Sequence, residues 1–321
     1  MRLVTYTLRG ISRLGAVLDD VGVVDLNRAC ALHRAERDAE RARALADFLV
    51  PPDMLAFLRA GDPAMDAARS ALAHAAAHVT RARDDAVASG LLVETSAAGF
   101  QLEAPVPRPG KILAVGVNYK DHSAETGIPL PKRPMIFAKA TTCANGPGMP
   151  VHRPKASPFL DWEGELCFVV GRRARHVSAE RALEHVAGYM IGNDVSVRDW
   201  QVHSQTMMMG KSWDTHGPMG PWLVTRDEVP DPGVLDLKTW VNDVLKQSSN
   251  TSQLIFGVPA LVEYLSTAFT LEPGDVVFTG TPSGVGVARD PKEFMKAGDV
   301  VRVEIMGLGV LENTVIDEPT T

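Results

Sequence analysis

The chain has 321 residues, a formal net charge of -6 at pH 7 and a hydrophobic content of 45%. A chain of this length and composition can bury a large core, as one big domain or as a big domain with a smaller appendage. The acidic balance argues against nucleic acid or an anionic membrane as the main partner, because both bind proteins through a basic face.

Signals for export and for cysteine chemistry are missing from the sequence. Residues 1–10 contain no apolar signal-peptide core, and no window approaches the ~18 apolar residues of a membrane span. We therefore expect a cytoplasmic protein. The three cysteines, Cys30, Cys143 and Cys167, lie far apart without a CxxC pair, which argues against a disulfide framework and a zinc knuckle.

Residues 1–105 are predicted to form a small α+β domain. Short apolar runs predict three strands, at residues 3–8, 15–18 and 21–24, and Asp19 and Asp20 are expected to form a turn between the last two. Residues 26–90 show helical spacing of Ala and Leu, with breaks at Pro51–Pro52 and at 61–63, and so predict helices. Because no catalytic residue types gather there, we expect a structural or dimer-supporting role for this domain.

Residues 106–321 are predicted to form the catalytic domain, after a proline-rich connector at 104–110. Apolar runs predict strands over residues 111–117, 135–138, 166–170, 189–191, 222–225, 237–241, 275–278 and 300–305. Only residues 179–185 and 260–267 show a helical pattern. Strands that rarely alternate with long helices favour a mainly β, mixed architecture over a doubly wound fold.

Three carboxylates occupy alternate positions ahead of an apolar run, at Asp161, Glu163 and Glu165. Since side chains on a strand alternate between two faces, all three are expected on one face. Buried like charges persist only when they are paired or bind a metal, and oxygen ligands favour Mg²⁺, Mn²⁺ or Ca²⁺ over zinc. A solvated strand edge is the alternative. Asp194, at the end of a second apolar run, is well placed to complete a site and favours the metal interpretation.

A histidine and a glutamate follow the first strand of the predicted catalytic domain. His122 and Glu125 share a face if the chain is helical there. A carboxylate beside an imidazole raises its basicity and fixes its tautomer, as a general base acting on water requires. A structural hydrogen-bonding role for His122 is the alternative. The proline-rich residues 127–134 are expected to form a loop that can close over a site.

Two glycine-containing stretches invite phosphate or nucleotide binding, and neither fits. Lys211 follows a glycine, but Gln205 stands where a phosphate-binding loop needs its first glycine. We interpret Lys211 as a donor to a developing oxyanion, with a solvated lysine as the alternative. Residues 279–286 lack the dinucleotide-binding register; they predict either a turn whose N–H groups bind a carboxylate or a plain turn.

Five motifs occur in an order that resembles the fumarylacetoacetate hydrolase family. They are Gly116-Val-Asn-Tyr-Lys-Asp-His122-Ser-Ala-Glu125, Asp161-x-Glu163-x-Glu165-Leu166, Gly192-Asn-Asp194-Val-Ser-Val-Arg198-Asp-x-Gln201, Gly210-Lys211-Ser212 and Leu271-Glu-Pro-Gly-Asp-Val-Val-Phe-Thr-Gly-Thr281-Pro-Ser-Gly-Val-Gly286. The resemblance runs from about residue 110 to the C-terminus, whereas residues 1–105 look like the variable extension of longer members. It implies an α+β, mainly β fold, a mixed β-sandwich roll that is usually homodimeric.

The resemblance also implies a set of site residues. It implies Mg²⁺ or Mn²⁺ at the positions matching Glu163, Glu165 and Asp194, and catalytic roles for His122, Glu125 and Lys211. It implies substrate contacts at positions matching Tyr119, Lys139, Arg198, Gln201 and Thr281. Asp161 is not usually a ligand in this family, which reduces the expected ligand set to three carboxylates. The chain departs from the family pattern at Asn242–Asp243, where an Asn-Gly turn is usual.

On this resemblance we expect a metal-dependent hydrolase that cleaves a carbon–carbon bond in a 1,3-diketo acid, such as an acylpyruvate or a fumarylpyruvate-like compound. His122 and Glu125 would activate water, Lys211 with Gln201 would stabilise the oxyanion, and the metal would stabilise the departing enolate. The same enolate chemistry serves two alternatives in aromatic catabolism: decarboxylation of oxaloacetate and isomerisation of 2-hydroxyhepta-2,4-diene-1,7-dioate. A non-catalytic metal-dependent binding protein is a third.

Overall fold

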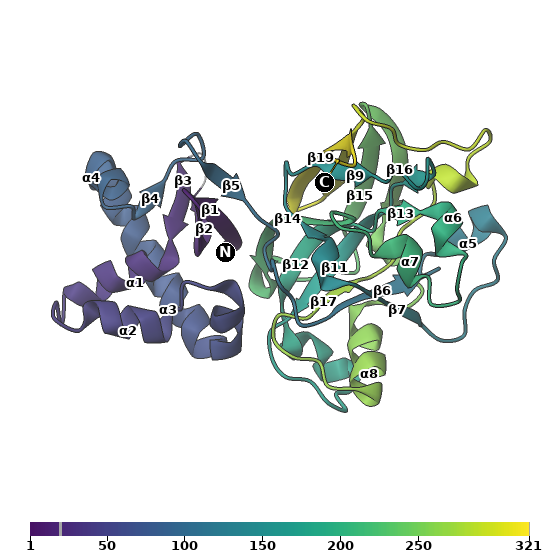
Figure 1. Ribbon diagram of the computed structural model, residues 1–321. Coiled ribbons are helices and arrows are strands. Elements are labelled where there is room, and N and C mark those ends of the chain that lie inside the picture. The colour runs from purple at the N-terminus through teal and green to yellow at the C-terminus, as the bar shows by residue number, and fades with distance from the viewer. Residues whose placement is uncertain (19–20, 321) are drawn as a thin grey trace.

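The computed structural model describes residues 1–18 and 21–320, so the turn predicted at Asp19 and Asp20 lies outside the described residues. Figure 1 shows a smaller N-terminal part beside a larger part. The smaller part is built from β1 (Arg2–Leu8), β2 (Ile11–Leu18), β3 (Gly22–Asp25), α1 (Leu26–Ala35), α2 (Ala42–Leu49), α3 (Met54–Arg81), α4 (Arg83–Ala88), β4 (Leu92–Val93) and β5 (Phe100–Leu102). None of the helices described is long and apolar enough to cross a membrane.

Capping side chains, prolines and a glycine set the boundaries of the helices in the N-terminal part. The Asp25 side chain accepts a hydrogen bond from the Arg28 N–H and caps α1, and Asp53 caps α3 in the same way. Pro51 and Pro52 separate α2 from α3, as predicted. The second predicted break is a kink within α3, where Gly61 adopts a φ of 71°, a conformation that favours glycine.

The larger part contains every strand predicted for residues 106–321. Its elements are β6 (Ile112–Gly116), α5 (Lys120–Thr126), β7 (Met135–Lys139), β8 (Ala144–Asn145), β9 (Val151–Arg153), β10 (Leu160–Asp161), β11 (Gly164–Val170), β12 (Val186–Asn193), β13 (Ser196–Val197), α6 (Arg198–Gln201), α7 (Met208–Lys211), β14 (Gly217–Thr225), β15 (Asp236–Val241), β16 (Val244–Asn250), α8 (Val258–Ala268), β17 (Val276–Phe278), β18 (Val300–Ile305) and β19 (Gly309–Asp317). The helix predicted at residues 179–185 is a 3-10 helix, Ala179–His185.

The prediction omitted four strands of two or three residues, β8, β9, β10 and β13, and two longer strands, β16 and β19. The inward-facing residues of the two longer strands explain why they were missed. Gln247 on β16 and Asn313 on β19 are both buried, with 1% of each residue exposed. A polar residue at an inward position interrupts the alternation of apolar and polar residues by which a half-buried strand is recognised. Their amides are satisfied by hydrogen bonds to other parts of the chain.

A long mixed sheet runs through both parts of the molecule in the order β4-β3-β2-β1-β14-β12-β11-β17-β6-β7. Antiparallel pairing of β1 with β14 aligns Leu3 with Leu223, so the sheet continues across the boundary predicted at residues 105 and 106. A second sheet, β16-β15-β18-β19-β9, lies against it. Leu166, Leu237 and Val303 belong to one buried cluster between these sheets. The mixed β-sandwich prediction is thereby confirmed.

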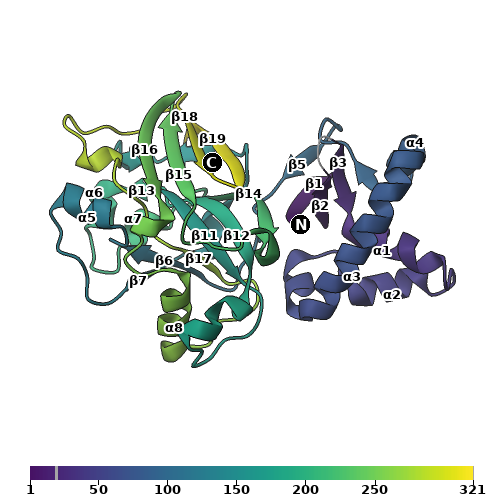
Figure 2. The same cartoon turned by 180° about the vertical axis from the view of Figure 1, so that it is seen from behind.

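The helices α5, α6 and α7 lie at one end of the larger part, on the side away from the N-terminal helices. Both views of the molecule show this separation (Figures 1 and 2). The acidic motif spans the break between β10 and β11, with Glu163 in the break itself, and Asp194 directly follows β12. The sandwich therefore brings the predicted site residues together at the end opposite the N-terminal part.

Candidate active site

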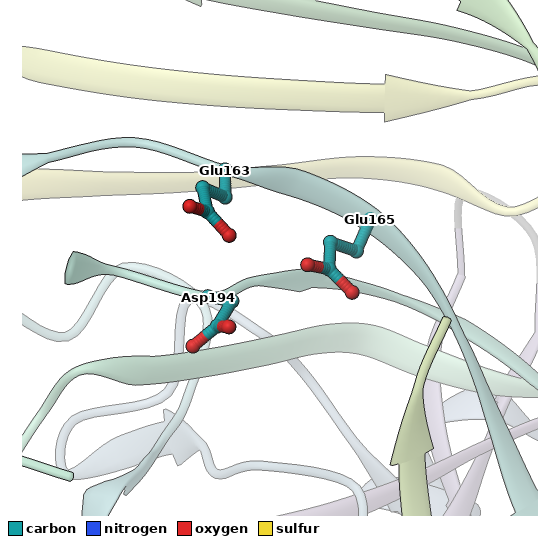
Figure 3. Close-up of side chains that lie close together, drawn as sticks. All are labelled: Glu163, Glu165 and Asp194. Carbon is teal, nitrogen blue, oxygen red and sulfur yellow. The ribbon is translucent and has the colours of Figure 1, made fainter. Parts of the chain in front are cut away.

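Three buried carboxylates, Glu163, Glu165 and Asp194, converge in the larger part. One oxygen of each lies within 4.8 Å of the others, and Figure 3 shows the three groups projecting into a common space. Antiparallel pairing of β11 with β12 places Glu165 opposite Gly192, two residues before Asp194. A side chain at Gly192 would collide with Cys167, because an added Cβ would lie 2.4 Å from its sulfur.

The turn that holds Glu163 beside Asp194 is locked by reciprocal hydrogen bonds. The Asp194 N–H donates to the Glu163 carbonyl at 2.9 Å, and the Glu163 N–H donates to the Asn193 side-chain oxygen at 2.9 Å. We predicted that Asp161, Glu163 and Glu165 lie on one face of a single strand, and this prediction is wrong for Asp161. That residue ends β10, one strand earlier, and its carboxylate turns away to Arg198.

Cations hold two of the three carboxylates. Lys211 Nζ donates to Glu163 Oε2 at 2.7 Å and to Asp194 Oδ2 at 2.9 Å. Arg198 Nη1 donates to Glu163 Oε1 at 2.7 Å, and Lys139 Nζ donates to Asp194 Oδ1 at 2.5 Å. Burial raises the pKa of Glu163, but Lys211 and Arg198 outweigh it and lower that pKa to about 2. Glu163 is therefore a permanent anion at neutral pH.

Glu165 is different, because no ion pair to it occurs within the described part of the chain. It accepts a hydrogen bond from the Gly280 N–H at 2.6 Å. Burial, followed by the charges of Asp194 and Glu163, raises the pKa of Glu165 well above its usual range. Among the three carboxylates of the cluster, Glu165 is therefore the one without a paired cation in the described residues. An all-oxygen donor set that is short of positive charge fits a hard divalent cation such as Mg²⁺ or Mn²⁺.

The predicted His–Glu pair forms on α5. His122 Nδ1 lies 3.3 Å from Glu125 Oε2, with 13% and 23% of the two side chains exposed. Both oxygens of Glu125 also accept the Gly284 N–H, at 2.9 and 3.1 Å. The charge of the His122 ring is the smallest of the influences that lower the pKa of Glu163. The geometry therefore places an oriented imidazole beside the acidic cluster.

The ammonium group of Lys139, which was predicted to contact a substrate, is bound by groups of the chain itself. Its Nζ donates to Asp194 Oδ1 and to the carbonyls of Lys211 and His216, which uses the three hydrogens of the ammonium group. The predicted substrate contact gives way to a supporting role beneath Asp194. Lys211 is also buried, but the bonds described for it use two of its three hydrogens, leaving one for a ligand.

Arg198 meets the acidic cluster and also retains a free donor. Its Nε donates to Asp161 at 2.7 Å, and its Nη1 donates to Gln201 Oε1 at 2.9 Å as well as to Glu163. Its Nη2 is buried, and within residues 1–18 and 21–320 it has no hydrogen-bond partner. A buried unpaired donor on a guanidinium suits an incoming carboxylate. Gln201 Nε2 points to Met207 Sδ at 3.6 Å.

The other two predicted substrate residues, Tyr119 and Thr281, are both buried. Thr281 Oγ1 donates to the Gly164 carbonyl at 3.0 Å and accepts from Gln247 at 2.8 Å, so its hydroxyl joins strands. The Tyr119 hydroxyl is buried and has no partner in the part of the chain that is described. Burial, and then the charge of Glu165, raises the Tyr119 pKa.

Residues 279–286 bind carboxylates through backbone N–H groups, as one of the two predictions for this turn proposed. The carboxylates belong to the protein itself: Gly280 binds Glu165, Gly284 binds Glu125 and Gly286 binds Asp161. The chain still makes a tight turn at Asn242–Asp243, where it departs from the family pattern. Both residues adopt a positive φ, 50° and 62°, in the two-residue turn between β15 and β16.

Asn193 and Gln247 shape the site through hydrogen bonds to the backbone and had not been predicted as site residues. Gln247 Oε1 accepts the Gly164 N–H at 2.9 Å, and its Nε2 donates to Pro282 O at 3.0 Å. Asn193 supports the Glu163 turn described above. Their local sequence carries no signal for these roles, because both act across strands that are distant along the chain.

Comparison with known proteins agrees with this geometry. The family model for the fumarylacetoacetate (FAA) hydrolase C-terminal domain matches residues 111–316. A Xenopus laevis protein named mitochondrial oxaloacetate tautomerase is 40% identical over 307 residues, which is 95% of this chain and 86% of that protein.

Solved structures show the same relationship. A fumarylacetoacetate hydrolase from Exiguobacterium antarcticum is 30% identical with a TM-score of 0.74, covering 99% of this chain and 100% of that one. A 2-hydroxyhepta-2,4-diene-1,7-dioate isomerase from Mycobacterium marinum is 38% identical with a TM-score of 0.61, covering 71% of this chain and 84% of that one. With the buried acidic cluster and the full set of motifs in place, the chain belongs to the fumarylacetoacetate hydrolase family.

Proposed function

We propose that the protein catalyses a proton shift in a small 2-oxo or 2-hydroxy diacid, with a divalent cation in the acidic cluster. Keto–enol tautomerisation of oxaloacetate is the first reaction to test. The convergence of Glu163, Glu165 and Asp194 beside the His122–Glu125 pair carries the proposal. The names of two relatives, an oxaloacetate tautomerase and a diene-dioate isomerase, support this class of reaction.

The expected carbon–carbon hydrolysis becomes the second candidate, because the relatives favour the isomerase alternative. A relative named fumarylacetoacetate hydrolase keeps the second candidate in the test. The two reactions need different things from His122. A proton shift needs a base at a carbon next to the carbonyl, whereas hydrolysis needs a base that activates water.

In this reaction His122, Arg198 and Lys211 have separate roles. When bound, Mg²⁺ or Mn²⁺ supplies a Lewis acid that polarises the 2-oxo group and acidifies the neighbouring C–H bond. His122, oriented through Nδ1 by Glu125, accepts the proton from carbon and returns it. The unpaired Nη2 of Arg198 donates to a substrate carboxylate. The remaining hydrogen of Lys211 faces the oxygen that gains negative charge, a contribution worth roughly 3 kcal/mol.

The test uses full-length protein stripped with a chelator and reloaded with Mg²⁺ or Mn²⁺. Disappearance of the oxaloacetate enol is followed by absorbance. We expect His122→Ala to lower kcat by about 10²–10⁴-fold while Mn²⁺ binding is retained, because the imidazole is the base and not a ligand. His33→Ala, on α1 in the N-terminal part, is the matched control and should leave kcat unchanged.

Isotopes separate the candidate reactions. In D₂O a proton shift places deuterium on the carbon next to the carbonyl, whereas hydrolysis in ¹⁸O-labelled water places the label in a released carboxylate. Formation of pyruvate and CO₂ from oxaloacetate would indicate decarboxylation. Full activity of His122→Ala on every candidate substrate would reject the assigned base.

Two further expectations stay predictions. The homodimer is tested by sedimentation of the purified chain. The cytoplasmic location is tested by fractionation of the source cells, and the printed name of the Xenopus relative assigns that protein to mitochondria.

A further inference from the structure

A short loop, residues 282–288, contacts both Glu125 of the His–Glu pair and Asp161 beside the acidic cluster. On one side the Gly284 N–H binds Glu125, the partner of the catalytic imidazole, at 2.9 Å. On the other side the N–H groups of Gly286 and Val287 bind the two oxygens of Asp161, at 2.7 and 2.9 Å. The 282–288 loop therefore joins the His–Glu pair to Asp161, which is a carboxylate outside the metal cluster.

Asp161 is fully buried and joins this loop to an arginine. Its Oδ1 also accepts the Trp162 N–H at 2.8 Å, and its Oδ2 accepts Arg198 Nε at 2.7 Å. Four donors thus hold one carboxylate. The other end of the same guanidinium holds Glu163 Oε1 at 2.7 Å. A continuous chain of hydrogen bonds runs from the 282–288 loop through Asp161 and Arg198 to a carboxylate of the acidic cluster.

Steric contacts fix the loop against Asp161. A Cβ added to Gly286 would lie 2.1 Å from the Glu293 carbonyl and 2.7 Å from Asp161 Oδ1. A Cβ added to Gly284 would lie 2.1 Å from the Lys246 carbonyl, and Gly284 also has a φ of +99°. The loop backbone lies too close to its neighbours for any side chain at these two positions. The geometry around Asp161 is consequently set by backbone packing.

We infer that Asp161 is a positioning residue that keeps Arg198 bound to Glu163 through a single nitrogen. With Nε held by Asp161, the guanidinium offers Nη1 to Glu163 and leaves Nη2 for a substrate carboxylate. Without Asp161, Nε is released, and Arg198 can turn Nη2 toward Glu163 Oε2 in competition with Lys211, which forms the two-pronged pair that guanidinium and carboxylate favour. Such a pair adds a second guanidinium nitrogen to a carboxylate that already accepts Arg198 Nη1 and Lys211 Nζ, and leaves its oxygens less available to a cation. The substrate part of this inference rests on the proposed function, whereas the metal part does not.

The test measures Mn²⁺ affinity of chelator-treated, full-length protein by calorimetry, which needs no substrate. We expect Asp161→Asn to weaken Mn²⁺ binding by about 10–100-fold, as loss of a partner behind a metal ligand does. At saturating Mn²⁺ we expect the KM for the diacid to rise more than kcat falls, because Arg198 Nη2 is displaced. Asp199→Asn is the matched control, since Asp199 neighbours Arg198 but binds Ser157 and the Trp200 N–H. Its Mn²⁺ affinity should equal that of the wild type.

A second variant keeps the carboxylate intact. Val287→Pro removes the N–H that binds Asp161 Oδ2 and leaves the carboxylate in place, at the second residue of a 3-10 helix, within the first turn where proline is tolerated. We expect a smaller weakening of Mn²⁺ binding in the same direction. If Asp161→Asn does not fold, this variant decides the question. Wild-type Mn²⁺ affinity in every folded variant would overturn the inference, whether or not the protein acts on oxaloacetate.

Discussion

Both parts of the molecule bury carboxylates, but they balance the charge differently. In the N-terminal part, Asp25 is 0% exposed and pairs with the Arg13 guanidinium, the Tyr6 hydroxyl at 2.8 Å and the Arg28 N–H at 2.9 Å. In the larger part, Glu165 shares a space with two other carboxylates and, among the described residues, has no cation of its own. A buried carboxylate whose hydrogen-bond and ion-pair partners are all supplied by the protein stabilises the fold. A buried carboxylate that lacks a cation can bind one from solution.

The strongest test of this comparison replaces Glu165 with the isosteric glutamine. We expect Glu165→Gln to weaken Mn²⁺ binding by at least about 100-fold and to abolish activity, because one of three ligands is lost. The chelator-treated variant should unfold at the same or a higher temperature than the wild type, since a buried charge repelled by its neighbours is removed. Calorimetric titration and thermal unfolding measure the two effects. Retained affinity with lower stability would show that Glu165 is structural.

The matched change in the N-terminal part is Asp25→Asn. It leaves the partly buried Arg13 guanidinium, whose side chain is 18% exposed, without its charged partner, so we expect the free energy of unfolding to fall by about 1.5–3 kcal/mol. Mn²⁺ affinity should stay at the wild-type value, because β3 lies at the far end of the sheet from the acidic cluster. Urea unfolding and calorimetry provide the measurements. A loss of metal binding in this variant would contradict the separation of the two parts.

Acid should destabilise the larger part through His216. Burial lowers the pKa of this imidazole to about 3, against about 6.5 in an unfolded chain. Below pH 6.5 the unfolded chain binds a proton that the folded chain excludes, so stability is full above that pH and falls as the pH decreases toward 3. We expect a loss of about 2 kcal/mol at pH 5. His216→Gln should flatten this dependence in urea unfolding, and an unchanged slope would contradict the assignment.

The smallest expected effect lies where the two parts meet. Arg69 on α3 forms two parallel bonds with Asp227, at 2.7 and 2.6 Å, but 37% and 46% of these side chains are exposed. Exposed pairs of this kind contribute about 1 kcal/mol or less. We therefore expect Arg69→Ala to lower the unfolding free energy by about that amount at low salt, and by less at high salt. A large loss of activity would indicate that this junction influences the site.

Sequence reasoning succeeded where the signal is local. Apolar runs located the more apolar strands of the larger part, and the spacing of His122 and Glu125 placed them on one face of α5. The acidic cluster was also predictable, because Glu163 and Glu165 are two residues apart and Asp194 directly follows β12, the strand that pairs with β11. Each of these features depends on residues within one element or on two strands that pair directly.

The tertiary structure alone decided which partner each charged side chain takes. Asp161 shares its motif with Glu163 but binds Arg198 and the 282–288 loop, and Lys139 is directed beneath Asp194 instead of toward a ligand. These choices join segments that are far apart along the chain. A buried charge must satisfy all its donors and acceptors within the packed interior, so its role follows from neighbours that no local pattern of residues records.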